Sequence, residues 1–202
     1  MSDGATRRWR IVAGVCSLLL ITTAAGAFAV DLGSARPDPV PFADTVKLGV
    51  TEELEQAAQH RGASIPRVEI FYSQYRYVVG YAGVAGAVSA LDAPGREQQF
   101  GYPIAVYASD YAGRAPRCEN GTLVTDTNPD WVPVTEAQFV VGSRASVAGE
   151  SVVVPFSVAD DAAAFADACG GRVVDWAALR RDPPPVPSAA GVKSRLDDRR
   201  SR

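Results

Sequence analysis

Side chains that can bind soft metals are few in this chain. Its 202 residues include three cysteines, one histidine and one methionine, and the methionine is the initiator. Thiolate and imidazole groups bind copper and zinc, but the sequence has neither a CxxC nor an HxxxH spacing. Cys118, Cys169 and His60 are therefore weak candidates for metal ligands. The two cysteines could instead form a disulfide or remain as two unpaired small residues, and both alternatives stay open.

A catalytic set of residues is not evident. His60 is the only imidazole of the chain, and a lone histidine near the end of a predicted helix is typical of a solvated cap. Asp160 and Asp161 form an acidic pair, but a place in the first turn of a predicted helix explains both. The sequence also lacks a phosphate-binding glycine loop. We therefore expect that the chain is not an enzyme.

An aromatic stretch is the one unusual cluster of side chains. It consists of Tyr72, Gln74, Tyr75, Arg76, Tyr77 and Tyr81. Tyrosine and arginine are enriched where proteins bind partners, so this stretch could form a contact surface for a ligand or protein. It could equally be a wall of the core whose hydroxyl groups reach solvent.

The compartment of these groups follows from an apolar run near the N-terminus. Residues 11–30 carry no charge, and Arg7, Arg8 and Arg10 precede them. About 20 such residues span a membrane as a helix, and a basic flank stays on the cytoplasmic side. The sequence predicts either one membrane crossing or a signal peptide that is cleaved after Ala29. Both alternatives place the remainder outside the cytoplasm, with the first attaching it to the cytoplasmic membrane.

The charge of the chain bears on whether its partner is a nucleic acid. The formal net charge is −3 and the isoelectric point is about 5.2, and no basic stripe follows the apolar run. A nucleic-acid partner is therefore not expected. The apolar fraction of 47% is ordinary for a folded protein, and the length after the apolar run suits one domain.

The predicted elements indicate an α+β fold. Residues 31–50 are Pro-rich and predict a linker, residues 51–180 a folded domain, and residues 181–202 a disordered tail. Hydrophobic periodicity predicts helices at 51–60 and 159–169 and a weaker helix over 78–91. Strands are predicted at 65–72, 102–109, 131–134, 138–142, 152–156 and 172–176, with a loop at 114–129. This order indicates small repeated strand-strand-helix-strand units after an N-terminal membrane segment.

Several short motifs occur in a familiar order along the second half of the chain. They are Asp110-Tyr111, Trp131, the stretch 136–143 (EAQFVVGS), Val154-Pro155-Phe156, the helix 161–166 and Gly170-Gly171. This order resembles the NosL family of exported, membrane-attached, copper-binding accessory proteins for nitrous oxide reductase. The resemblance implies an α+β fold, copper as a possible cargo, and a respiratory metalloenzyme or its maturation complex as a possible partner.

The chain departs from the family pattern at the expected copper ligands. The family typically carries a Cys-Gly-Met motif at the start of the exported domain, and none occurs between residues 30 and 71. A family methionine after the Gly-Ser strand is also missing, because residues 146–149 read SVAG. The resemblance therefore identifies no copper ligand here. It implies an exported, membrane-tethered accessory protein, with a metal-free interaction module as the alternative and an exported enzyme as the least expected case.

Overall fold

The computed structural model describes residues 36–74, 78–147 and 149–187. The chain divides into two compact units, Met1–Pro37 and Asp38–Arg202, and every element below belongs to the second. The predicted membrane segment at 11–30 lies outside the described residues, as do Tyr75, Arg76 and Tyr77. Within the described ranges, no helix has the length and apolar character needed to cross a bilayer.

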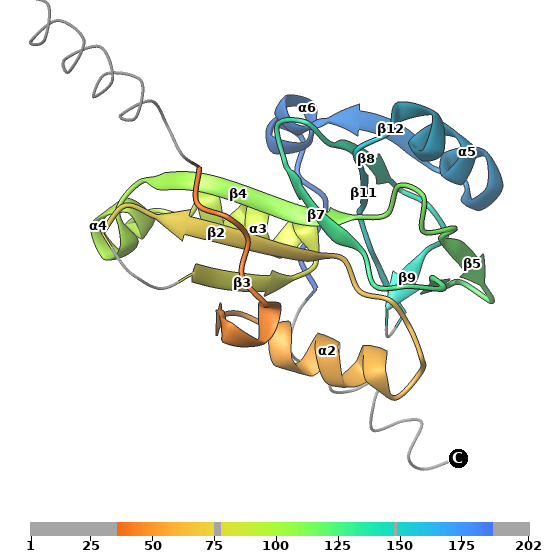
Figure 1. The fold of residues 1–202 in the computed structure, drawn as a ribbon, viewed down its shortest axis with the longest axis horizontal. Coiled ribbons are helices and arrows are strands. Elements are labelled where there is room, and N and C mark those ends of the chain that lie inside the picture. Colours follow the sequence, from red (N-terminus) through yellow and green to blue (C-terminus); the bar gives the residue numbers. More distant parts are fainter. Residues whose placement is uncertain (1–35, 75–77, 148, 188–202) are drawn as a thin grey trace, which may run out of the picture. The chain divides into compact units, whose positions relative to one another are not determined.

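A five-stranded sheet dominates the first part of this unit (Figure 1). Its strands lie in the order β1 (Val46–Lys47), β3 (Val78–Ala82), β2 (Arg67–Tyr72), β4 (Pro103–Asp110) and β7 (Asp130–Pro133). β2 is central and runs antiparallel to both β3 and β4. Helix α3 (Val84–Leu91) packs against β2 and β3, and its residues Val84 and Val88 are fully buried.

The N-terminal residues of the unit cover the other face of this sheet. The short helix η1 (Phe42–Asp44) precedes β1, and α2 (Thr51–Gln59) follows it. Phe42 and Thr45 lie directly above Gly80 of β3, where a Cβ atom would come within 2.9 Å of the Phe42 ring. The sheet is thus covered on both faces, by α3 on one and by residues 40–45 on the other.

Two smaller sheets form the second part. One has the order β11 (Val154–Phe156), β8 (Gln138–Val141), β12 (Arg172–Asp175), with α5 (Ala159–Cys169) and α6 (Trp176–Arg181) packed against it. The other has the order β10 (Glu150–Ser151), β9 (Ser146–Val147), β6 (Thr122–Val124), β5 (Arg117–Glu119). A short helix, α4 (Arg96–Phe100), precedes β4.

The two parts share one topology. In the first, β2 pairs with β3 on one side and with β4 on the other, and α3 followed by the short α4 connects the two outer strands. In the second, β8 pairs with β11 and β12, and α5 connects them. All four pairings are antiparallel. The predicted strand-strand-helix-strand unit therefore occurs twice, and the α+β class is confirmed.

Strand β8 contributes to both hydrophobic cores of the unit. Phe139 and Val141 point into the core that contains α3 and the inner face of the large sheet. Val140 points the other way, into the core formed by α2, α5 and the β5–β6 hairpin. Alternating side chains of one strand thus tie the two repeated units together.

The structure corrects three expected segments. Residues 78–91 are not one helix, because Gly83 takes a φ of 91° and separates β3 from α3. Residues 114–129 are not only a loop, since they contain the β5–β6 hairpin with Asn120 and Gly121 at its turn. The Pro-rich segment 31–50 contains η1, which packs on the sheet through Phe42, and β1, which is the edge strand of that sheet.

Candidate functional site

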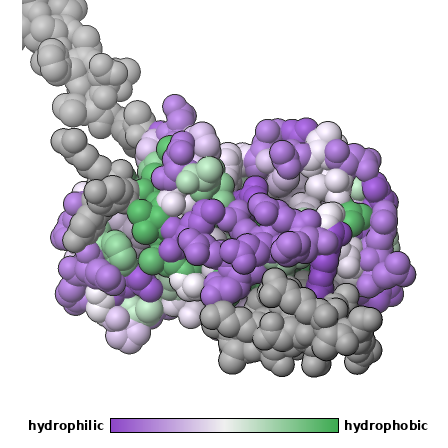
Figure 2. All heavy atoms as spheres, turned by 90° about the horizontal axis from the view of Figure 1, so that it is seen from below, coloured by the Kyte–Doolittle hydropathy of each residue, from purple (hydrophilic) through white to green (hydrophobic). Residues whose placement is uncertain are grey.

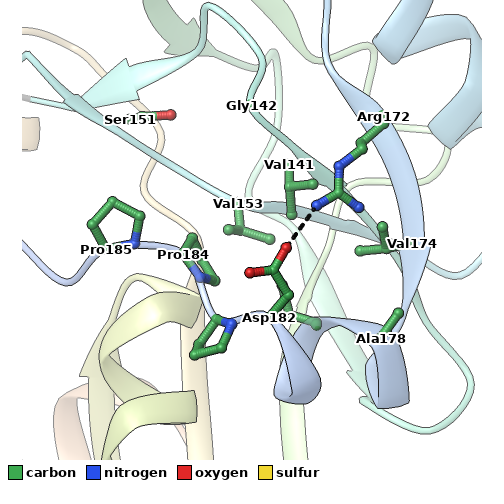
Figure 3. A pocket seen from close by; sticks show the side chains of 12 residues that line it. Val141, Gly142, Ser151, Val153, Arg172, Val174, Ala178, Asp182, Pro184 and Pro185 are labelled. Atoms are coloured by element: carbon green, nitrogen blue, oxygen red, sulfur yellow. Dashed lines mark hydrogen bonds and ion pairs between the residues drawn. The ribbon is translucent and has the colours of Figure 1, made fainter.

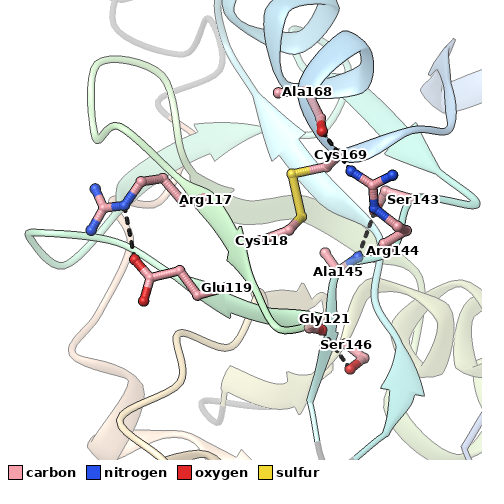
Figure 4. Close-up of a disulfide and its surroundings, with 10 residues drawn as sticks. All are labelled: Arg117, Cys118, Glu119, Gly121, Ser143, Arg144, Ala145, Ser146, Ala168 and Cys169. Carbon is pink, nitrogen blue, oxygen red and sulfur yellow. Dashed lines mark hydrogen bonds and ion pairs between the residues drawn. A yellow bond between two sulfur atoms is a disulfide. The ribbon is translucent and has the colours of Figure 1, made fainter.

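The structure joins the two candidate cysteines. Cys118 lies in β5 and Cys169 is the last residue of α5, and a disulfide connects them with a Cα–Cα distance of 5.9 Å (Figure 4). The sequence left open whether Cys118 and Cys169 form a disulfide or stay unpaired, and in the structure they form the disulfide. While the bond is intact neither sulfur is a thiolate, so the pair offers no strong metal ligand.

Both cysteines stand on elements that are held in place by other contacts. In α5, Phe165 is buried and packs against Phe156, with ring centroids 5.4 Å apart. In β5, Cys118 pairs with Leu123 of β6, which is fully buried in the same core. The hairpin and the helix therefore meet through core packing as well as through the disulfide.

Charged side chains surround this junction. Arg144 donates one hydrogen bond from its guanidinium to the carbonyl oxygen of Ala168 at 2.7 Å. Its backbone N–H donates another to the carbonyl oxygen of Cys169 at 2.9 Å. These carbonyls belong to the C-terminal end of α5, which carries partial negative charge, so a cation there is favourable.

A second arginine stiffens the hairpin. Arg117 forms ion pairs with Glu119 at 3.1 Å and Asp126 at 2.9 Å. The hydrogen bond from Arg117 lowers the pKa of Asp126 below its usual value, while Asp126 raises the pKa of Arg117. All three side chains are exposed, so these pairs orient the hairpin more than they stabilise it.

An apolar pocket of about 380 Å³ lies between α5, β11 and the loop before β5. Its lining comes from the loop before β5, the end of β11 and one side of α5, and it consists of Gly113, Ala115, Pro116, Phe156, Asp161, Ala164, Phe165 and Ala168. Pro116 and Ala168 are close neighbours in sequence of the two cysteines. Neither cysteine lines the pocket itself.

His60 does not join the two cysteines in a metal site. It follows the last residue of α2 and is exposed. Across residues 36–74, 78–147 and 149–187, no group of three or more histidine, cysteine, aspartate and glutamate side chains is placed to hold a metal ion. The cysteine pair is therefore the only point where two of the candidate ligands meet in the described part of the chain.

The sequence left the aromatic stretch as either a contact surface or a wall of the core, and its two described tyrosines lie in the core. Tyr72 and Tyr81 are only 3% and 5% exposed and belong to the core beneath α3. Their hydroxyl oxygens have no hydrogen-bond partner among the described residues. Burial raises the pKa of Tyr72 and raises that of Tyr81 to about 12, so both hydroxyls stay protonated. Gln74 is exposed, and it is the one described member of the cluster at the surface.

Glu69 is a buried acid that the sequence reasoning missed. It lies in the centre of β2, is fully buried, and faces Gly80 and Tyr107 on the neighbouring strands. One carboxylate oxygen accepts a hydrogen bond from the backbone N–H of Val40 at 3.1 Å, and the other has no partner within the described ranges. Burial raises the pKa of Glu69 to about 7. The alternation of β2 places Glu69 away from α3, but it gives no sign that residues 40–45 cover that face.

A second pocket, of about 340 Å³, lies where α6 and the start of the C-terminal tail meet β8 and β12 (Figure 3). Its walls are mainly valines and prolines, and Arg172 and Asp182 form an ion pair at 3.3 Å in it. His60, the only histidine of the chain, is not in its lining. The pocket therefore holds no nucleophile activated by an imidazole.

The described part of the surface carries few large hydrophobic side chains. The face drawn in Figure 2 is largely hydrophilic with small hydrophobic patches. Large hydrophobic side chains that are exposed in the described part are Val46, Tyr102, Ile104, Val158, Val173 and Val186. Tyr102 and Ile104 are neighbours at the start of β4, and single exposed residues of this kind are normal on folded proteins.

Comparison with known proteins identifies the family. The sequence model of the NosL family matches residues 58–183. Among solved structures, the crystal structure of the copper chaperone NosL from Shewanella denitrificans is similar, with 22% identity over 55% of this chain and 76% of that one and a TM-score of 0.43. The solution structure of the apo-NosL protein from Achromobacter cycloclastes has 26% identity over 55% and 82%, with a TM-score of 0.38. No protein with a curated function matches significantly. Because the family match spans more than half of the sequence, the chain belongs to the NosL family.

Proposed function

We propose that this chain is an exported, membrane-tethered accessory protein that serves the assembly of a copper-dependent respiratory enzyme, nitrous oxide reductase or a related one. The observation that carries the proposal is the NosL match over residues 58–183. It includes both repeated units from β2 to α6. The role is to hold or deliver copper rather than to catalyse a reaction.

Two independent features support a place outside the cytoplasm. The uncharged run at 11–30 after three arginines is an export or anchor signal in the sequence. The Cys118–Cys169 disulfide is a bond that persists in oxidising compartments and is rare in the cytosol. Both features agree with a domain that works on the far side of the cytoplasmic membrane.

The alternative is a NosL-type interaction module that carries no metal. It is favoured by one specific observation, the disulfide that occupies both thiols of the folded unit. The chain also has no methionine after Met1, so thioether ligands of the kind that bind Cu(I) are missing from the folded unit. The two candidate functions differ in whether copper reaches the chain at all.

Deletion of the gene in its native host tests the proposed role. The copper content of the respiratory copper enzymes, isolated from the membrane and exported fractions, is expected to fall in the deletion strain. The full-length chain should restore it. A chain that lacks residues 1–30 should fail to restore it, because that chain stays in the cytoplasm.

The outcomes separate the parts of the proposal. Unchanged copper content in the deletion strain would exclude the accessory role. Full restoration by the chain without residues 1–30 would exclude the extracytoplasmic location.

A further inference from the structure

We propose that Cys118 and Cys169, once their disulfide is reduced, form a two-coordinate site for Cu(I), so that the redox state of this pair controls copper binding. The inference rests on the proposed function, because it names the place where this chain would hold its cargo. It differs from the family pattern, in which a Cys-Gly-Met motif at the start of the domain and a later methionine supply sulfur.

The helix end that carries Cys169 stays in place without the disulfide. Phe165 and Ala162 anchor α5 in the core against Phe156, and both are buried. Arg144 bonds the last carbonyls of the helix through its side chain and its backbone. Loss of the S–S bond therefore removes one of several contacts that position this thiol.

The strand that carries Cys118 is held in a similar way. Its neighbours Arg117 and Glu119 pair with Val124 and Thr122 of β6, and Leu123 between them is fully buried. The Arg117–Asp126 ion pair connects the hairpin to the loop that follows it. The two thiols therefore remain neighbours after reduction, with Cα atoms near the 5.9 Å that separates them in the disulfide.

The number and type of ligands favour Cu(I) over other metals. Thiolates are soft ligands that select Cu(I). Structural zinc requires four ligands, and the described part of the chain offers no third histidine, cysteine or carboxylate in a metal-binding group. Cu(I) is stable with two thiolates alone, so the pair is sufficient for this ion.

The local charge suits an anionic copper complex. Two thiolates and one Cu(I) carry a net charge of −1, and Cys169 sits at the negative end of the α5 dipole. The Arg144 guanidinium, bonded to the Ala168 carbonyl at the same helix end, offsets this charge (Figure 4). A nearby arginine also favours the thiolate form that binds the metal.

The chemistry balances in two steps. An external dithiol attacks the Cys118–Cys169 bond through a mixed disulfide, becomes a disulfide itself, and transfers two electrons and two protons to the pair. Cu(I) then binds both sulfurs and displaces the two protons, with no change in its oxidation state. Cys169 is buried and Cys118 is partly exposed, so a reductant or copper donor approaches the pair at Cys118.

A Cu(I) titration of the full-length chain in detergent tests the site. All variants carry Cys16→Ala, so that Cys118 and Cys169 are the only thiols. The chain is reduced with a phosphine under oxygen-free conditions, and Cu(I) is supplied from a chromophoric chelator. We expect one tightly bound Cu(I) per reduced chain and none on the disulfide form. We also expect bound Cu(I) to raise the melting temperature of the reduced chain, because it recloses the same loop.

Three variants make the assignment specific. Cys118→Ser with Cys169→Ser should lose the tight site, and His60→Ala, which removes the only imidazole, should keep it. Arg144→Gln should weaken binding by roughly 10- to 100-fold, as expected for a neighbour that supports the ligands. The disulfide form of the unchanged chain is the folded control for the double serine variant.

The results bear on this inference and on the accessory role separately. Equal Cu(I) binding by the reduced and disulfide forms, or no binding by the reduced chain, would overturn the dithiol site. If the deletion strain still loses enzyme copper in that case, the accessory role stands and the chain acts without this site. If the dithiol binds Cu(I) but deletion has no effect, the site stands and the accessory role fails.

Discussion

Glu69 places an ionisable group where the surrounding residues favour its neutral form. It is fully buried in the middle of β2, and the backbone N–H of Val40 is its one described hydrogen-bond donor. Burial raises its pKa from 4.5 to about 7, and the hydrogen bond from Val40 only partly opposes this. The N-terminal residues that cover the sheet are therefore coupled to the protonation of this carboxyl group.

The pH dependence of stability follows from this shift. Below pH 4.5 the carboxyl group is protonated in both the folded and the unfolded chain, so it adds no pH dependence. Between pH 4.5 and about 7 the folded chain retains the proton and the unfolded chain loses it, so stability falls as pH rises. The full loss is about 3 kcal/mol, from roughly 1.4 kcal/mol per pKa unit.

Glu69→Gln should remove this loss, because glutamine is neutral and of similar shape. The free energy of unfolding in urea, measured from pH 4.5 to 8, should fall less steeply for the variant than for the unchanged chain. Glu52→Gln, on the exposed side of α2, serves as the matched control and should leave the slope unchanged. A Glu69→Gln slope equal to that of the unchanged chain would show that Glu69 is ionised in the folded state.

At the residue scale the sequence identified some site residues and missed others. Cys118 and Cys169 were found because thiols are rare in this chain, but their pairing depends on contacts between elements 51 residues apart. The sequence left Tyr72 and Tyr81 either at a contact surface or in a wall of the core, and the structure has both in the core beneath α3. Glu69 was missed because the segment that buries it is far away in sequence and looks like a linker.

At the scale of the elements, packing in the first repeated unit depends on a few positions where other residues come very close to the backbone. Gly80 of β3 is one of them, because Phe42 and Thr45 of the N-terminal cover lie directly on it. Gly86 of α3 is different, since a Cβ there would meet only the Tyr81 ring at 3.8 Å. The two glycines therefore respond to the same substitution in opposite directions.

Gly80→Ala should destabilise the chain by about 1–3 kcal/mol, because the added methyl group overpacks against the N-terminal cover. Gly86→Ala should stabilise it by about 0.5–1 kcal/mol, because alanine is the better helix former. Thermal unfolding of the two variants and the unchanged chain measures both effects. Equal stability of the two variants would show that residues 42–45 do not press on the sheet at Gly80.

The elements with strong sequence signals were predicted well. Helix α5 matches the expected 159–169 because acidic residues open it and Gly170-Gly171 close it. Strands β8 and β12 follow their valine-rich runs. The prediction of one helix over 78–91 was wrong because this run of alanine and valine fits a helix and a strand alike. In the structure, the positive φ of Gly83 separates strand β3 from helix α3. The β5–β6 hairpin was not predicted, because a strand of three residues is too short to show a hydrophobic alternation.

At the scale of the whole molecule, the chain belongs to the NosL family and has two cysteines that a disulfide joins. Family membership and the twofold strand-strand-helix-strand unit were both accessible from the sequence, through motif order and hydrophobic pattern. The joining of β5 to α5 was not, because it arises from the docking of the hairpin onto the second unit. That junction gives a methionine-poor chain two sulfur atoms side by side.

The ratio of bound copper to reduced Cys118–Cys169 pairs is the most direct test of copper binding by these two thiols. The full-length chain is isolated from its own membranes without oxygen, its copper is measured by mass spectrometry, and its Cys118 and Cys169 thiols are counted by alkylation after the metal is removed. We expect bound copper to rise in proportion to the reduced cysteine pair, to one ion per reduced chain, and to be missing from the disulfide form. Copper that is bound equally by chains with an intact disulfide would contradict it.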